Sequence, residues 1–218
     1  MQAIIHYQFN DELLLKMAIT HRSFSKNNNN ERLEFLGDSI LGLVISGHLF
    51  NRLESASEGE LSRVRASLVK EESLAMVARD IELGEFLRLG SGELKSGGFR
   101  RASILSDALE AIFGAIYLDG GYRQCEKTIL FLYQDYMVTL PAPGDLKDPK
   151  TSLQEHLQGQ KIELPVYDVV NTEGKSHDQI FTIECRIEEL SVLTEGKGSS
   201  RKKAEQMAAS KALAQVKK

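Results

Sequence analysis

Three of the chain's four prolines fall within nine residues, from Pro141 to Pro149. Proline has no backbone N–H and interrupts helices, and this segment follows neither the period of a helix nor that of a strand. We therefore expect a linker at residues 141–150, between a first part at residues 1–140 and a second part at residues 151–218. Each part is long enough to bury a core, so the 218 residues are expected to form two domains.

Before the linker, apolar residues recur at the spacing of helices, and convincing strand alternation is absent. Five helices are expected, at residues 11–20, 31–53, 59–79, 103–118 and 122–138. The first part of the chain is therefore predicted to be an all-α domain.

After the linker the periodicity changes. A helix is expected at residues 151–158, with Thr151 as its N-cap. Short alternating runs then predict three strands, and a helix closes the chain: the strands lie at 167–170, 181–187 and 190–194, and the helix at 200–217. The second part is therefore predicted to be a small α+β domain with the order α-β-β-β-α.

The composition favours a reduced cytoplasmic protein. The mean hydropathy is -0.25, and we expect no apolar run to approach the roughly 20 residues that a membrane-spanning helix needs. Residues 1–10 lack the basic and apolar regions of a signal peptide. Cys125 and Cys185 lie sixty residues apart, without the spacing of metal ligands. No membrane partner is expected.

The first long helical stretch carries three carboxylates on one face. Glu31, Glu34 and Asp38 are spaced i, i+3 and i+7, and the residues that follow, 40–45, are apolar on every side. We therefore expect a buried helix, in which ionised carboxylates are costly unless they are paired or bound to a metal. A solvated acidic stripe is the commoner explanation of such spacing, but the apolar continuation weakens it.

A second apolar stretch repeats this feature. Asp107 and Glu110 are the only charges at residues 104–116, and their i, i+3 spacing places them on one face. The pair fits a core salt bridge with an arginine, but two such helices together suggest carboxylate faces that meet around a hard cation. Oxygen ligands without His or Cys favour Mg²⁺ or Mn²⁺ over zinc. Magnesium held in this way is a standard device for phosphodiester hydrolysis.

Glycines inside these two stretches support close packing. Gly37, Gly42 and Gly47 recur at near-helical spacing in the first stretch, and Gly114 lies in the second. Glycine costs about 1 kcal/mol relative to alanine inside a helix, so its presence favours the approach of another backbone. For any single glycine, simple tolerance is an equally good explanation.

The formal net charge of -4, taken alone, argues against a polyanionic partner. The charges are unevenly distributed, however, because residues 197–218 hold seven Lys or Arg residues and one acid. Arg201, Lys202 and Lys203 stand at the expected start of the last helix. Cations there oppose the helix dipole unless an anion binds, so the cluster favours a phosphate ligand over a merely solvated basic face.

Three regions of the second part could contact a nucleic acid together. Lys197 and Ser199 adjoin the basic helix start, His177 lies in a loop between the first two expected strands, and Gln154 lies on the first helix. His177 alone would more often be an ordinary surface histidine. Three contact regions match the recognition of double-stranded RNA by shape, through two successive minor grooves and the phosphates between them.

The chain resembles the bacterial ribonuclease III family over essentially its whole length. The nonamer ERLEFLGDS at residues 31–39 is similar to that family's highly specific signature. Further matching segments lie at residues 20–23, 59–66 and 92–101, in the helix with Asp107 and Glu110, and in a C-terminal double-stranded-RNA-binding domain. His156 departs from the resemblance, because an aromatic residue is expected there.

The resemblance implies an Mg²⁺-dependent endonuclease, with Mn²⁺ as a substitute, that cleaves double-stranded RNA. Its products would carry 5′-phosphate and 3′-hydroxyl ends with short 3′ overhangs, and its substrates would be ribosomal RNA precursors and structured mRNA and tRNA precursors. It implies metal-binding carboxylates at Glu34, Asp38, Asp107 and Glu110, of which Asp38 and Glu110 are catalytic, and auxiliary acids at Glu31 and Glu58 nearer the RNA. The family acts as a homodimer through the nuclease domain, for which apolar Phe35 and Leu36 are suited.

Two other functions explain part of the sequence. A regulatory protein could hold duplex RNA without cutting it, although none of the four core acids is missing. A hydrolase of small phosphorylated metabolites would account for the first domain and leave the second unexplained.

Overall fold

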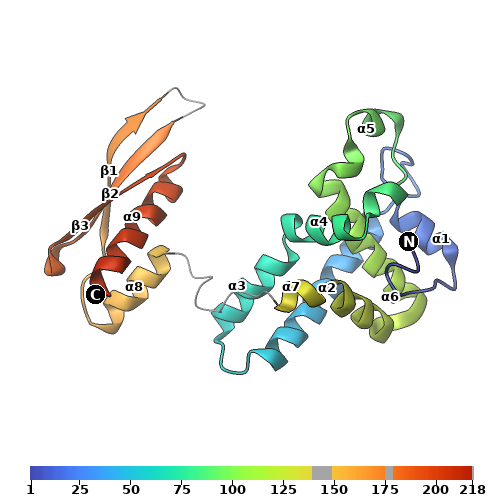
Figure 1. Cartoon of the computed structure of the whole chain (residues 1–218), viewed down its shortest axis with the longest axis horizontal. Coiled ribbons are helices and arrows are strands. Elements are labelled where there is room, and N and C mark those ends of the chain that lie inside the picture. The colour runs from blue at the N-terminus through green and yellow to red at the C-terminus, as the bar shows by residue number, and fades with distance from the viewer. Residues whose placement is uncertain (139–148, 175–178, 218) are drawn as a thin grey trace. The chain divides into compact units, whose positions relative to one another are not determined.

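Figure 1 shows the computed structural model of the chain, which describes residues 1–138, 149–174 and 179–217. Most of the predicted linker and His177 therefore lie outside the described residues. The chain divides into two compact units, Met1–Asp145 and Leu146–Lys218. Each unit is described by itself.

The first unit is helical, as predicted. Its elements are α1 (Glu12–Ala18), α2 (Glu31–Arg52), α3 (Glu58–Val69), α4 (Glu71–Asp80), α5 (Ser91–Lys95), α6 (Ala102–Leu132) and α7 (Gln134–Val138), with short 3-10 turns at Leu83–Phe86 and Gly98–Arg100. In the described part of this unit, strand-like pairing is limited to an isolated bridge between Thr20 and Arg88.

Two helix boundaries differ from the prediction. The expected helix at 59–79 is two helices, because Lys70 adopts an extended conformation (φ -72°, ψ 155°) that ends α3 and begins α4. Apolar spacing continues across this break, so the pattern gave no sign of it. The predicted boundary between the helices at 103–118 and 122–138 is confirmed within α6, because Gly121 leaves the helical conformation there (φ 77°, ψ 178°). The second of these helices ends at Leu132 rather than at residue 138, and α7 follows it.

The core of this unit is built on the contact between α2 and α6 (Figure 1). A Cβ atom on Gly37 would lie 1.8 Å from the carbonyl oxygen of Glu110, and one on Gly114 would lie 2.2 Å from that of Leu33. The predicted close approach of backbones is therefore confirmed at these two positions. Gly42 and Gly47 have no such neighbour within 4 Å, so the prediction is wrong for them.

Helix α2 is buried on one side only, contrary to the expectation of a fully buried helix. Leu41 and Ile45 are buried, whereas Phe35, Leu43 and Phe50 are 79%, 59% and 70% exposed. We call these three residues the apolar stripe of α2. The expectation that no run approaches the length and composition of a membrane span is also wrong for α2, although the core helix of a soluble protein meets the same criteria.

The second unit has the predicted α-β-β-β-α order. It comprises α8 (Pro149–Gly159), β1 (Val166–Glu173), β2 (Ile180–Ile187), β3 (Val192–Gly198) and α9 (Arg201–Val216). The strands form an antiparallel sheet in the order β1-β2-β3, and α9 packs against β2 and β3. The core contains Leu153 and Leu157 of α8, Cys185 and Ile187 of β2, and Ala208, Ala209 and Ala212 of α9.

Two details of this unit correct the prediction. Thr151 is not an N-cap, because α8 already begins at Pro149, and proline is favoured at the first position of a helix. The third strand begins at Val192 rather than at residue 190. Ser191 adopts a left-handed conformation (φ 50°) at the end of a 3-10 turn, which delays the strand.

Candidate metal centre and RNA-binding face

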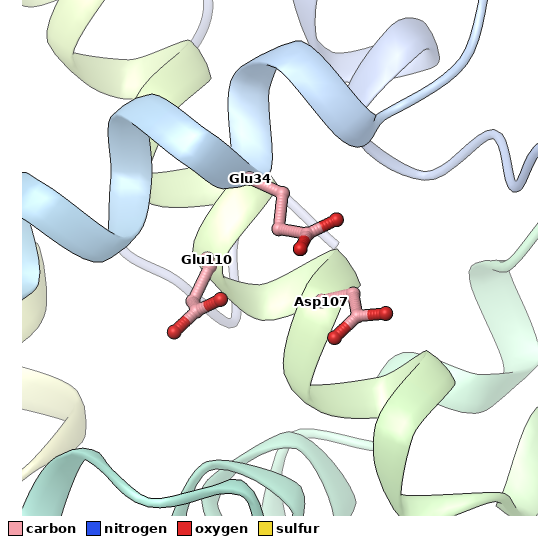
Figure 2. Close-up of side chains that lie close together, drawn as sticks. All are labelled: Glu34, Asp107 and Glu110. Atoms are coloured by element: carbon pink, nitrogen blue, oxygen red, sulfur yellow. The ribbon is translucent and has the colours of Figure 1, made fainter.

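Three of the predicted carboxylates come together between two helices. Figure 2 shows Glu34 on α2, with Asp107 and Glu110 one turn apart on α6. One oxygen from each of the three side chains lies within 4.8 Å of the others. We call these three residues the carboxylate cluster. Its donor set consists only of oxygen, which suits Mg²⁺ or Mn²⁺.

Close contact between the backbones of α2 and α6 brings the side chains of the carboxylate cluster together. Gly37 is about one turn along α2 from Glu34, and it faces the backbone of Glu110 itself. Because neither Gly37 nor Gly114 has a side chain, the two helices approach until their carboxylates meet. The same pair of glycines therefore fixes the spacing of the core and of the site.

The carboxylates destabilise one another's ionised forms. Burial, and then the nearby charges of Asp38, Glu34 and Asp107, raise the pKa of Glu110 to about 8. Burial followed by the charge of Asp107 raises the pKa of Glu34, and burial is the largest cause of the raised pKa of Asp107. Such a group of like charges is stabilised when a cation binds among them. The residues present thus fit a divalent metal.

Asp38 stands apart from this cluster. Its side chain is exposed on α2, and it is not among the three residues whose oxygens come together. Its charge nevertheless contributes to the raised pKa of Glu110, so it acts at the edge of the same site. The structure thus brings together three of the four predicted metal ligands, and the role of Asp38 stays a prediction.

The two predicted auxiliary acids lie outside the cluster. Oε1 of Glu31 lies 3.3 Å from Nη1 of Arg22. Glu58 is the first residue of α3, where it accepts a hydrogen bond of 2.8 Å from Ser62. It lines a different cavity, together with Phe50.

Basic residues that the sequence pattern did not indicate as functional lie beside the cluster. A cavity of about 390 Å³ is lined by Glu34 and Asp107 and also by His21, Arg22 and Arg101. The segments at 20–23 and 92–101 contributed to the family resemblance, which was the available signal. Nothing in their residue types alone distinguished these side chains from ordinary surface bases.

The predicted RNA-contacting residues of the second unit are exposed where the structure describes them. They are Gln154 on α8, Lys197 at the end of β3, Ser199 beside it, and Arg201, Lys202 and Lys203 in the first turn of α9. The Ser200 hydroxyl caps α9 by accepting a hydrogen bond from the backbone N–H of Lys203. His156, which stands where the family resemblance leads us to expect an aromatic residue, is half-buried. Its Nε2 lies 3.2 Å from Nε2 of Gln160.

Comparisons with known proteins agree with both halves of this description. A family model described as ribonuclease-III-like matches residues 11–136, and one described as double-stranded RNA binding motif matches residues 149–216. Ribonuclease 3 of Shewanella denitrificans is 53% identical over 97% of this chain and 93% of its own length. Ribonuclease 3 of Hahella chejuensis is 53% identical over 98% of this chain and 94% of its own length.

A solved structure is similar to the helical unit. It is the nuclease domain of ribonuclease III from Campylobacter jejuni, described for structural flexibility in a region involved in dimer formation. The superposition has a TM-score of 0.61 at 46% sequence identity and covers 62% of this chain and 94% of that domain.

Proposed function

The chain belongs to the ribonuclease III family of double-stranded-RNA endoribonucleases, and we propose that its carboxylate cluster holds Mg²⁺ for the hydrolysis of duplex RNA. The observation that supports the choice of site is the convergence of Glu34, Asp107 and Glu110 from two buried helix faces. Mn²⁺ would substitute, because it accepts the same oxygen ligands. The products would carry 5′-phosphate and 3′-hydroxyl ends with short 3′ overhangs.

The carboxylate side chains of this chain would have different roles in the hydrolysis. When bound, the metal supplies positive charge that stabilises the attacking and leaving oxygens of phosphodiester hydrolysis. Glu34, Asp107 and Glu110 would hold it, and the deep position of Glu110 makes this residue the most sensitive to loss of charge. Asp38, at the solvent edge beside Glu110, would position the attacking water.

The proposed assembly is a homodimer through the nuclease domain, with each subunit cutting one strand. The apolar stripe of α2 supports it, because three large apolar side chains on one helix face solvent within a single chain. The related Campylobacter jejuni domain contains a region described as involved in dimer formation. Leu36 on the same helix was also expected to contribute, and it is half-buried.

The proposed domains are a nuclease at residues 1–140 and an RNA-binding domain at residues 151–218. We place the enzyme in the cytoplasm, where it would process ribosomal RNA precursors and structured mRNA and tRNA precursors. The basic start of α9, with Lys197, Ser199 and Gln154, would contact the RNA backbone, and His177 would enter a groove.

A cleavage assay with end analysis tests this function. Long duplex RNA should be cut in Mg²⁺ and left intact in EDTA, and its fragments should accept a new 5′-phosphate from a kinase only after phosphatase treatment. Single-stranded RNA and small phosphorylated metabolites should be poor substrates. Binding without cleavage in Mg²⁺ would instead indicate a regulatory RNA-binding protein.

Metal binding should stabilise the fold more at high pH than at low pH. The pKa of Glu110 is raised from its ordinary 4.5 to about 8, so the metal-free fold loses stability as the pH rises through this window. Mg²⁺ at about 100 times its Kd should add about 2.7 kcal/mol to the free energy of unfolding at a pH where its binding displaces no proton from Glu110. We expect Tm to rise by about 5 to 10 °C at pH 8.5 and by less at pH 6, as measured by thermal unfolding.

Glu110→Gln is the control for this effect, because it removes the titrating group while keeping its size. The variant should lose most of the metal-induced rise in Tm and most of its pH dependence. A wild-type rise in Tm that is the same at both pH values would show that Glu110 does not hold the ion.

Salt dependence tests the RNA-binding face. Replacing both Lys202 and Lys203 with alanine should lower the slope of log Kd against log salt by about 1 to 2, because each phosphate contact releases counterions. Lys217→Ala, at the far end of α9, is a matched control that should leave the slope unchanged. Both variants should remain folded, and the double variant should gain a few tenths of a kcal/mol because its cations oppose the helix dipole. A wild-type slope in the double variant would remove both lysines from the phosphate contacts.

A further inference from the structure

Two side chains of α9 cover the outer edge of β3. Among the described residues, β3 pairs with β2 on one side only, so its other side is an edge of the sheet. There the backbone N–H of Lys197 donates a hydrogen bond of 3.5 Å to Sδ of Met207. Two residues earlier, the carbonyl oxygen of Glu195 accepts a hydrogen bond of 2.8 Å from Nζ of Lys211. Met207 and Lys211 are one turn apart on α9, so both lie along the same edge.

Lys197 stands between two glycines that lie directly on α9. A Cβ atom on Gly196 would lie 2.1 Å from the carbonyl oxygen of Ala204, and one on Gly198 would lie 2.7 Å from the backbone N of Ala204. Glycine leaves the backbone more conformational freedom than any other residue. The position of Lys197 at the end of β3 therefore depends on its contacts with α9, and the sulfur of Met207 provides one of them.

The thioether of Met207 lies within the proposed RNA-binding face. On its β3 side it contacts Lys197, and Lys203 in the first turn of α9 is one turn before it. Both lysines are among the proposed phosphate contacts. Met207 is nevertheless 46% exposed, so solvent and small solutes reach it.

The other sulfur atoms of the chain are less suited to oxidation or lie in the other unit. Cys125 and Cys185 are buried, and burial raises the pKa of Cys125 to about 12 and also raises that of Cys185. Peroxides attack the thiolate, which such cysteines do not form at neutral pH. Of the five methionines, all of which the structure describes, only Met76 and Met207 are exposed, and Met76 belongs to α4 of the helical unit.

We propose that Met207 is an oxidation site through which a hydroperoxide weakens the binding of RNA. The hydroperoxide ROOH transfers its terminal oxygen atom to the sulfur, so the S=O bond forms and the O–O bond breaks. The sulfur loses two electrons, and the proton of the attacked hydroxyl group leaves with the other oxygen as ROH. Sulfoxide reductases reverse this oxidation. The inference rests on the proposed RNA-binding face.

Oxidation changes the contact between Met207 and Lys197. An oxygen atom has no room between a sulfur and a nitrogen that are 3.5 Å apart, so the side chain or the end of β3 must move. The sulfoxide oxygen is also polar and carries partial negative charge. It would lie beside the lysines that are proposed to meet phosphate, and like charges repel. Both effects oppose the binding of RNA.

The test compares the full wild-type chain with Met207→Leu and Met76→Leu, each before and after treatment with hydrogen peroxide. Leucine is similar in size to methionine and carries no sulfur. Met76→Leu is the matched control, because Met76 is 44% exposed and lies outside the RNA-binding unit. The measurements are the sulfoxide content of each methionine by peptide mass spectrometry, Kd for a short RNA duplex in Ca²⁺ at several salt concentrations, and Tm.

We expect peroxide to oxidise Met207 and to raise the wild-type Kd by about three- to tenfold, which corresponds to the loss of one contact. The slope of log Kd against log salt should fall by about 1, and Tm should fall by no more than about 2 °C. Treatment with both sulfoxide reductases should restore the original Kd. Met207→Leu should bind about twofold more weakly than wild type, because it lacks the weak sulfur acceptor, and peroxide should not weaken it further. Met76→Leu should bind and respond to peroxide as wild type does.

An unmodified Met207 after peroxide treatment would overturn the proposal, and so would a wild-type Kd in protein whose Met207 is fully oxidised. Weaker binding with an unchanged salt slope and a large loss in Tm would overturn it as well, because the effect would then come from unfolding. These results leave the proposed function intact if the untreated chain binds and cleaves duplex RNA. An untreated chain that does not bind duplex RNA would refute both the proposed function and this inference.

Discussion

Replacing Glu110 with glutamine is expected to lower kcat on duplex RNA by at least about 10³-fold while leaving RNA affinity in Ca²⁺ nearly unchanged. Glu110 is the most buried member of the carboxylate cluster, and it lies among the charges of Asp38, Glu34 and Asp107. Glutamine keeps its shape but cannot supply the negative charge that a divalent ion requires. RNA affinity should persist because the proposed phosphate contacts of Lys197, Arg201, Lys202 and Lys203 lie in the second domain, which matches the double-stranded RNA binding motif.

The fold of this variant should survive, because the metal-free site already favours a neutral Glu110. Its pKa of about 8 means that the side chain is mostly protonated at neutral pH without metal. Glutamine resembles that protonated state. Metal-free Glu110→Gln should therefore unfold at the wild-type temperature below about pH 4.5, and its unfolding temperature should increasingly exceed that of the wild type as the pH rises from there to about 8.

Glu126→Gln is the matched control, because it lies on the same helix, where Oε1 accepts a hydrogen bond of 3.1 Å from Tyr122. It should retain wild-type kcat. Cleavage in Mg²⁺ by Glu110→Gln at more than about a tenth of the wild-type rate would show that the catalytic metal lies elsewhere.

The position of the site was predictable because charge is rare in apolar helices. Asp107 and Glu110 are the only charges at residues 104–116, and Glu34 belongs to a similar pattern on α2. Burying an ionised carboxylate costs free energy unless an opposite charge compensates it. A cation shared by the carboxylates was therefore the simplest prediction. The structure places these three side chains together. The same spacing could not show that Asp38 is exposed to solvent. The period of a helix predicts which residues share a face, but it does not predict how deeply each side chain is buried.

The basic residues that line the cavity beside the carboxylate cluster were not predictable from residue types. Arg22 and Arg101 are separated by most of the nuclease domain in sequence, and each is an ordinary surface base on its own. Their common position depends on how the loop at 91–101 turns at Gly97. The family resemblance marked both segments as important without indicating what their side chains contact.

An apolar stretch of sequence also does not indicate whether it is buried in the core of its own chain or at an interface with another subunit. The residues after Asp38 on α2 predicted burial on every side, yet the apolar stripe of Phe35, Leu43 and Phe50 faces solvent in a single chain. A protein core and a subunit interface select the same residue types, so the sequence alone cannot separate them. Likewise, the sequence did not indicate the break between α3 and α4 at Lys70, because apolar residues keep their helical spacing across it.

Gly37→Ala is expected to destabilise the nuclease domain by at least about 3 kcal/mol, near the upper range for overpacked cores. The new Cβ would lie 1.8 Å from the carbonyl oxygen of Glu110 and 3.1 Å from the backbone N of Gly114. These are backbone atoms in the centre of two packed helices, so α2 and α6 must move apart. Because Glu34 and Glu110 lie on opposite sides of this contact, cleavage should fall together with stability.

The matched controls are Gly42→Ala and Gly47→Ala on the same helix, where a Cβ meets nothing within 4 Å. Alanine is the better helix former, so each should stabilise the domain by about 0.5 to 1 kcal/mol. Chemical denaturation measures both effects, and the opposite signs separate backbone contact from helix propensity. A stabilised Gly37→Ala would show that α2 and α6 do not touch at this residue, and the placement of the carboxylate cluster by the two glycines would be wrong.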